Sequence, residues 1–305
     1  MGNFKGFLFG ILSSATFGLI PLFTLPVMAQ GMRFDSILFY RFLLAAVAIG
    51  VVLVIKKQSF TIRLSEIPTL LYLSIFYVMS ALFLFWGYNY LPSGIATTIH
   101  FLYPVFVTLI MMIFYHEKSS IVTILSIIMA ICGVACLSIG DDNYGINLTG
   151  TGIVLISAVG YALYIVRVNK SRVRYMAGTK LTFYVLFFGS ILFLINTQTK
   201  GGLQPIPDWK AACNLTMLAI IPTVVSNLAL VQALKNIGST LTAILGAMEP
   251  LTAVCVGIVA FHEPFSARLA FGFILIITAV SLIILARPFE KGIRQLRIHI
   301  RQMHK

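Results

Sequence analysis

Ten runs of about 20 mostly apolar residues follow one another along the chain, separated by short polar breaks. An α-helix of about 20 residues crosses a hydrocarbon layer about 30 Å thick. Only 10% of the residues are charged and 59% are hydrophobic, whereas soluble domains carry about 25% charged residues. A transmembrane β-barrel would instead show short segments of alternating polarity. We therefore predict an all-α polytopic membrane protein with ten transmembrane helices.

The breaks between the runs carry turn residues or charge. The predicted spans cover residues 4–29, 36–55, 67–90, 93–115, 120–139, 150–169, 179–197, 211–233, 239–261 and 267–286. With ten spans, both termini and the even-numbered loops share one side of the membrane. That side holds 17 of the 22 lysines and arginines, and the other side holds 5. Because basic residues gather on the cytoplasmic side, we expect a cytoplasmic (inner) membrane protein with both termini in the cytoplasm.

An internal repeat divides the chain into two similar halves. YPVFVTLIMMIFYHE (103–117) and EPLTAVCVGIVAFHE (249–263) align without gaps, and each lies in the fourth span of a five-span half. Five is odd, so the halves must cross the membrane in opposite directions. We predict inverted five-helix repeats at 1–142 and 143–288, followed by a basic amphipathic cytoplasmic tail at 289–305 that lies on the anionic inner leaflet. Inverted repeats are typical of secondary transporters, whose substrate site lies near the midplane between the repeats.

These features resemble the drug/metabolite transporter superfamily, and specifically its EamA-type family. The resemblance rests on the ten spans, the five-plus-five repeat, the proline-led half-spans that end in His-Glu, and Arg41-Phe42 in the second span. It covers essentially the whole chain. It implies a permease or exporter of metabolites, amino acids among them, driven by protons or another gradient. The family often has a glutamate before the proline in both halves, whereas Tyr103 stands before Pro104 here.

Glu249 is an acid in the middle of an apolar span. It lies ten residues into its predicted helix, which is about 15 Å deep at 1.5 Å per residue. An acidic side chain at that depth costs about 2.5–3.5 kcal/mol to insert, so it usually faces a cavity or a partner. Pro250 removes one helical N–H bond and opens the backbone beside the acid. We predict that Glu249 couples transport to protons or binds a substrate amine; the alternative is a hydrogen bond that joins two helices.

Further polar residues lie within the predicted spans. His100 and Tyr103 share a helix face, and inverted symmetry would bring them to Glu249, although a neighbouring carbonyl could equally satisfy the histidine. Arg41 could snorkel to the interface, bind an anionic group or pair with Glu249. The simpler interpretation of Asn227 is an interhelical hydrogen bond. The simpler interpretation of Trp86 is an interfacial or packing aromatic. The predicted substrate-binding or proton-coupling residues are Glu249, Tyr103, His100, Arg41, Pro250, Pro104, Asn227 and Trp86.

The expected function is secondary active transport of a small metabolite by alternating access. One acid and one arginine suit a zwitterion such as an amino acid, with export and proton coupling as the expected mode. No P-loop occurs in the sequence, and we expect no cofactor, no metal and no enzymatic activity. The net charge of +13 fits a cytoplasmic surface better than nucleic-acid binding, and the size suits a monomer or homodimer. An intramembrane enzyme and a receptor or channel scaffold remain the alternatives.

Overall fold

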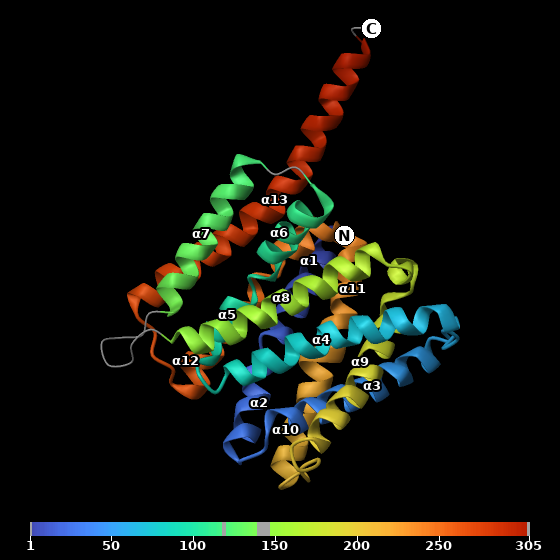
Figure 1. Ribbon diagram of the computed structural model, residues 1–305, viewed down its shortest axis with the longest axis vertical. Coiled ribbons are helices and arrows are strands. Elements are labelled where there is room, and N and C mark those ends of the chain that lie inside the picture. The colour runs from blue at the N-terminus through green and yellow to red at the C-terminus, as the bar shows by residue number, and fades with distance from the viewer. Residues whose placement is uncertain (1, 118–119, 139–146, 304–305) are drawn as a thin grey trace.

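The computed structural model describes residues 2–117, 120–138 and 147–303, and within them every regular element is helical. Figure 1 shows the helices as one bundle. The elements are α1 (Gly2–Phe17), α2 (Ile20–Ala29), α3 (Phe34–Ile55), η1 (Leu64–Glu66), α4 (Ile67–Gly87), α5 (Ser93–His100), α6 (Tyr103–Tyr115), α7 (Ile121–Ser138), α8 (Leu148–Lys170), η2 (Arg172–Tyr175), α9 (Gly178–Gln198), α10 (Trp209–Ala219), the π-helix η3 (Ile220–Val225), α11 (Ser226–Leu245), α12 (Met248–Phe261) and α13 (Ala267–Met303).

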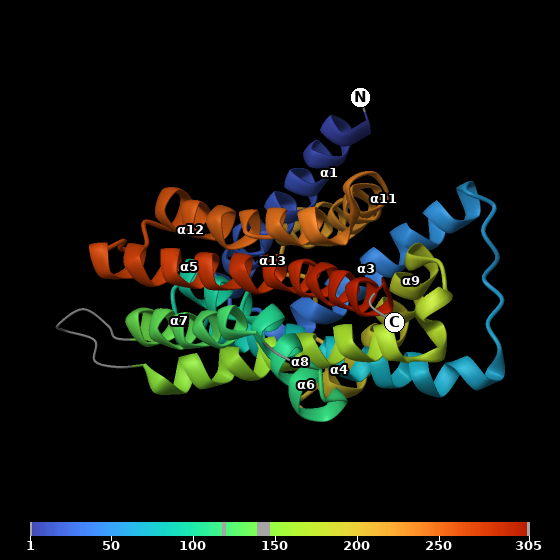
Figure 2. The same cartoon turned by 90° about the horizontal axis from the view of Figure 1, so that it is seen from above.

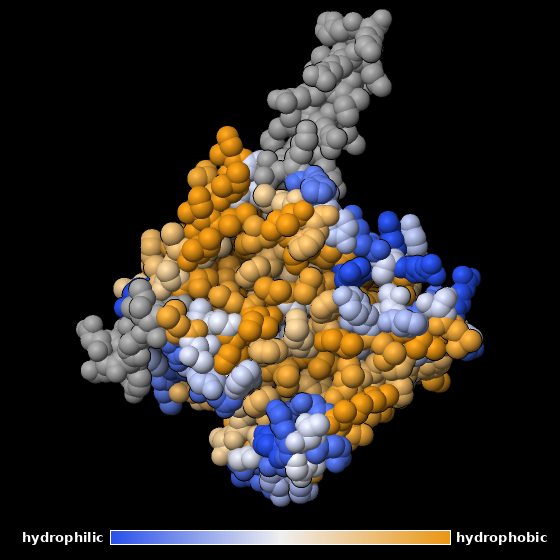
Figure 3. All heavy atoms as spheres, in the orientation of Figure 1, coloured by the Kyte–Doolittle hydropathy of each residue, from blue (hydrophilic) through white to orange (hydrophobic). Residues whose placement is uncertain are grey.

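Ten apolar helical stretches are present in the described residues. Eight are long and apolar enough to cross a membrane, and two shorter ones, Ile121–Leu137 and Met248–Phe261, complete the set. The predicted fold class is thus confirmed. Figure 3 shows apolar side chains over much of one flank, with hydrophilic ones over the segment between α9 and α10 and over the connection between α8 and α9. This distribution suits a bundle whose flank faces lipid and whose ends face water.

The helices pair across the two halves of the chain. The second span packs on the seventh (α3 on α9), and the fifth packs on the tenth (α7 on α13). Similarly, α5 packs on α12, while α1 packs on α11 and α8 packs on α4. Figures 1 and 2 both show α7 beside α13. Each of these pairs joins one half to the other, as two interlocked inverted repeats require.

The fourth span of each half is a broken helix. In the first half α5 ends at His100 and α6 begins at Tyr103, and in the second half α12 begins at Met248 after a two-residue turn. A proline follows within the first turn of both later helices, where its missing N–H costs no helical bond. The predicted continuous helix over 93–115 is therefore interrupted near its middle.

Both of these helices also end in the same way. His116 (φ 50°, ψ 33°) and His262 (φ 54°, ψ 33°) adopt the left-handed conformation directly after α6 and α12. Their N–H groups donate to the carbonyls of Met111 and Gly257, which closes each helix. The two His-Glu pairs are therefore equivalent helix ends, as their place in the repeat predicts.

The chain turns back on itself within α11. Gly6 of α1 lies against Ile237, whereas Gly10, further along α1, lies against Leu245. A straight helix from Ile237 would carry Leu245 about 12 Å further in the same direction, beyond the start of α1. Although its residues are helical throughout Ser226–Leu245, α11 therefore changes direction between Ile237 and Leu245. Its membrane-spanning part ends at Ile237, where the sequence KNIGST predicts a break.

The last helix, α13, is longer than a membrane span. Its apolar part ends at Leu285, and the helix continues without a break to Met303. Figure 1 shows this extension leaving the bundle. Residues 289–303 of the predicted tail are helical, residues 304–305 lie outside the described part, and the position of the tail on the inner leaflet stays a prediction.

Candidate functional site

Arg41 is buried in the interior of the bundle. Its residue is 3% exposed, and the Nε–H group donates to the Thr223 hydroxyl at 3.1 Å. The guanidinium carbon lies 5.6 Å from the ring centroid of Phe85. Thr223 belongs to the π-helix η3, and its own hydroxyl proton goes to the carbonyl of Leu218. Both partners of Arg41 are neutral, and no carboxylate in the described residues lies within ion-pair distance of it.

Glu249 is buried in the first turn of α12 with only 7% of its surface exposed. Its Oε1 atom has no hydrogen-bond partner in the part of the chain that the structure describes. Phe85, which faces the guanidinium of Arg41, lies 5.6 Å from the ring of Tyr88. The acid and the arginine are both buried and do not form an ion pair with each other in the described residues.

Four tyrosines and His100 form one aromatic cluster inside the bundle. The ring of Tyr161 on α8 lies 4.7 Å from that of Tyr103 and 5.9 Å from that of Tyr164. Tyr77 on α4 lies 5.1 Å from Tyr164, and His100 lies 5.6 Å from Tyr161. Of these rings, the sequence predicts Tyr103 and His100 as site residues. The other three sit on neighbouring helices, and only folding brings them together.

His100 is oriented by two serines. Its Nδ1 atom lies 2.9 Å from the Ser157 hydroxyl, which in turn donates to the carbonyl of Ser80 at 2.6 Å. Because a hydroxyl carries one proton, Nδ1 of His100 must be the donor in the first bond. The neutral ring then keeps Nε2 as an acceptor. No hydrogen bond joins His100 to Glu249 in the described residues.

A symmetry-related serine contact joins the other pair of helices. Ser13 and Ser226 exchange two hydrogen bonds of 2.8 Å, each from one hydroxyl to the other backbone carbonyl. Ser13 precedes Ser157 by 144 residues, and Ser80 precedes Ser226 by 146, close to the offset of the repeat. The serines were not predicted, although their shared offset was a signal that the sequence offered. The symmetry does not extend to the histidine, because Gly246 stands where the repeat places the equivalent of His100.

A cavity with about 420 Å³ of empty space opens beside the cluster. Its lining includes Phe17, Ser226 and Asn227 together with Tyr77, Tyr161 and Tyr164. The amide nitrogen of Asn227 donates to the carbonyl of Thr223 at 2.6 Å. The predicted residue Asn227 therefore borders the cavity, one turn from the partner of Arg41.

The remaining predicted residues lie around the two broken helices or outside the cluster. Pro250 is buried directly after Glu249, and Pro104 is half-buried directly after Tyr103. Trp86 is 37% exposed and contacts Phe83 and Tyr90, so it does not border the cavity. Among the described residues, no group of three or more His, Cys, Asp or Glu side chains is placed to hold a metal.

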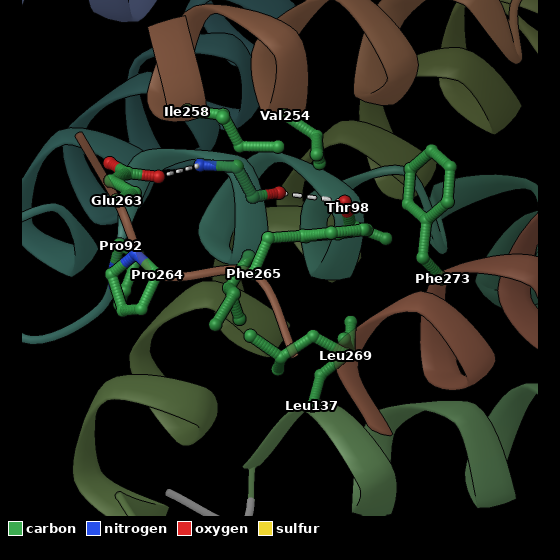
Figure 4. Close-up of a pocket in the computed structure, with 12 residues that line it drawn as sticks. Pro92, Thr98, Leu137, Val254, Ile258, Glu263, Pro264, Phe265, Leu269 and Phe273 are labelled. Carbon is green, nitrogen blue, oxygen red and sulfur yellow. Dashed lines mark hydrogen bonds between the residues drawn. The ribbon is translucent and has the colours of Figure 1, made fainter. Parts of the chain in front are cut away.

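A second cleft, with about 330 Å³ of empty space, lies between α5, α12 and α13. Figure 4 shows apolar side chains around it, among them Val254, Leu269 and Phe273, and one carboxylate, Glu263. The carboxylate points to the start of α5 and away from the apolar centre of the cleft.

Comparison with known proteins shows a common family. The sequence matches the model of the EamA-like transporter family at residues 4–139 and 148–285. It is 27% identical over 237 residues to the uncharacterized transporter YvbV of Bacillus subtilis (strain 168), covering 74% of this chain and 72% of that one. It is 25% identical over 252 residues to an uncharacterized transporter of Archaeoglobus fulgidus, covering 81% and 87%.

A solved crystal structure shares the fold. It superposes with a TM-score of 0.67 at 15% sequence identity, over 92% of this chain and 98% of the other. The family match spans both halves of the chain, and the relatives are transporters by name. The protein is therefore a multi-pass membrane protein that belongs to the EamA-like transporter family.

Proposed function

We propose that this transporter moves a small zwitterionic metabolite, such as an amino acid, through the tyrosine-lined interior by alternating access. The observation that carries the proposal is a pair of buried, oppositely charged side chains that do not neutralise each other. Glu249 has an unbonded carboxylate oxygen, and Arg41 has only neutral partners. In this proposal Glu249 binds the substrate amine and Arg41 binds its carboxylate.

The physical reason is the cost of a buried charge without a counter-charge. Such a group is destabilising unless it is paired or neutralised, and a zwitterion supplies both missing charges at once. Tyrosine rings add apolar surface and polarisable faces around the ligand, and a cation beside an aromatic face is favoured by about 0.5–2 kcal/mol. In this proposal Tyr77, which lines the cavity with Tyr161 and Tyr164, contacts the middle of the ligand.

Proton coupling and export complete the proposal. When the substrate amine leaves, a proton would bind Glu249 and replace the positive charge of the amine. The proton and the amine therefore compete for one carboxylate. His100, with Nε2 available as an acceptor, is the second proton-binding group in the proposal. The excess of basic residues on the side of the termini supports a cytoplasmic location for both ends.

Ligand-dependent thermal stability tests the site. We would purify wild type, Glu249→Gln and the matched control Glu117→Gln, whose carboxylate is exposed, and screen amino acids at two pH values. A ligand at about 100 times its Kd stabilises the fold by roughly 2.7 kcal/mol. We expect one compound to stabilise wild type and the control in a pH-dependent way, and Glu249→Gln to lose the effect.

Two further measurements make the result specific. Arg41→Gln should lose the preference for an amino acid over the corresponding amine without a carboxylate, because the second charge contact is gone. Uptake into proteoliposomes should saturate with substrate and follow a pH gradient. If Glu249→Gln binds ligands like wild type and is only less stable, the acid joins helices and the proposed site is wrong.

A further inference from the structure

The Glu263 carboxylate forms a contact between the two halves of the transporter. It follows His262 at the end of α12, and its Oε1 atom accepts hydrogen bonds from the backbone N–H and the hydroxyl of Ser93, both at 2.7 Å. Its Oε2 atom accepts from the backbone N–H of Gly94 at 3.2 Å. Figure 4 shows the side chain reaching the start of α5 beside Pro92. We call this contact the Glu263 clasp.

The clasp uses strong interactions. The first N–H groups of an α-helix have no partner within the helix, and a negative charge at that end also interacts favourably with the helix dipole. Hydrogen bonds to an ionised carboxylate are roughly twice as strong as those between neutral groups. Here one side chain from the second half satisfies two such donors of α5 and one hydroxyl.

Two glycines make room for the clasp. A Cβ atom on Gly257 would lie 2.2 Å from Oε2 of Glu263, so only a residue without a side chain lets the carboxylate fold against α12. A Cβ atom on Gly94 would lie 2.9 Å from the Cα atom of Val254. The helices α5 and α12 therefore meet in a tight seam at this end.

The opposite membrane face carries the same His-Glu motif, but it lacks the glycine that makes space for the carboxylate. Glu117 follows the left-handed His116 as Glu263 follows His262. However, Met111 stands where the repeat places Gly257, 146 residues later. By analogy with Gly257, a side chain at that position would occupy the space that the clasp needs, and Glu117 is exposed. The repeated His-Glu pair thus has different roles at the two faces.

The seam leads from the clasp into the proposed substrate site. From Ser93, α5 runs inward and ends at His100, and α12 runs outward from Glu249 to the loop that holds Glu263. Separating these two helices at the clasp would open a way from the membrane face opposite the termini to the buried acid. We propose that the Glu263 clasp holds this face of the transporter closed and must release Ser93 and Gly94 for it to open. The proposal rests on the alternating-access part of the proposed function.

Distances between spin labels test the clasp without a known substrate. The four native cysteines, Cys132, Cys136, Cys213 and Cys255, are replaced by alanine. Labels are placed at Asn89→Cys, just before α5, and at Ala260→Cys, near the end of α12, both of which are exposed positions. Pulsed electron resonance then reports the fraction of molecules with the seam open.

Three variants separate the clasp from general effects. Glu263→Gln removes the charge, and Gly257→Ala displaces the intact carboxylate. Each should raise the open-to-closed ratio at least about tenfold, which corresponds to about 1.4 kcal/mol. Glu117→Gln removes the matched carboxylate at the opposite face and should leave the distances unchanged. Circular dichroism and gel filtration confirm folding, and if Glu263→Gln does not fold, Gly257→Ala decides.

The outcome is independent of the substrate site. Wild-type distances in both Glu263→Gln and Gly257→Ala would overturn the clasp, even if Glu249→Gln loses ligand binding as proposed. An equal opening in Glu117→Gln would also overturn it, because the effect would not be specific to this seam. Conversely, an open seam in the clasp variants together with normal ligand binding by Glu249→Gln would uphold the clasp and reject the proposed substrate site.

Discussion

Replacing Gly18, in the turn between α1 and α2, with alanine should force this turn and α12 apart. A Cβ atom at this position would lie 2.4 Å from the carbonyl oxygen of Glu249, 2.8 Å from Cβ of Thr252 and 3.3 Å from the backbone nitrogen of Ala253. Two of these three neighbours are backbone atoms, which cannot rotate away as the end of a side chain can. Relief requires a shift of the helix that carries Glu249.

The size of the effect follows from a matched comparison. Forcing extra atoms into a packed interior typically costs about 1–3 kcal/mol. Gly152, in α8, faces open space, because a Cβ atom there would meet no other atom within 4 Å. Alanine at that position should gain about 1 kcal/mol from helix propensity. The free energies of unfolding of Gly18→Ala and Gly152→Ala should therefore differ by roughly 2–4 kcal/mol.

Thermal unfolding in detergent, with and without the ligand found for wild type, measures this difference. We expect a lower Tm for Gly18→Ala and a smaller stabilisation by ligand, since the carbonyl that must move belongs to Glu249 itself. Gly152→Ala should match or exceed wild type in both. Equal Tm values for the two variants would refute the conclusion that the turn after α1 is in backbone contact with α12 at Gly18.

Two further predictions concern contacts that are distant in sequence. Ser13→Ala and Ser226→Ala should each destabilise the fold. A double-mutant cycle should give a coupling free energy of about 0.5–3 kcal/mol, because each hydroxyl donates to the backbone carbonyl of the other serine. Additive effects of the two substitutions would contradict this. Arg33→Ala should speed proteolysis after α9, because Arg33 donates to the carbonyls of Lys200 and Gly202 at 2.6 and 2.5 Å, and an unchanged rate would show that other contacts hold this loop.

The number of spans could be predicted from the sequence because a lipid environment leaves few choices. Backbone groups in the hydrocarbon region must be satisfied within helices, so hydropathy reports helices directly. The repeat was visible in the His-Glu pairs because both end a helix in the same left-handed turn at His116 and His262. The interruption after His100 was not predicted, since Phe101 and Leu102 are as apolar as the helices beside them.

The neighbours of the site residues could not be predicted in the same way. Arg41 has a partner 182 residues away, and its depth alone allowed both burial and snorkelling. The chain contains 12 tyrosines, and membrane helices commonly carry them, so nothing singled out Tyr77 or Tyr161 before their rings were seen together. Glu263 was predicted to mark a helix end, but its bonds to Ser93 depend on a contact across 170 residues.

The crosswise pairing of the halves has a consequence for biosynthesis. Ser13 and its partner Ser226 are separated by 213 residues, and translation adds about 5–20 residues per second. The first helix therefore resides in the bilayer for roughly 10–40 s before α11 is made. During that time Ser13 and Arg41 must find temporary partners among lipids, water or insertion factors. A chain that ends before residue 223 lacks the partners of both Ser13 and Arg41, so these polar groups stay unsatisfied by the contacts of the complete fold.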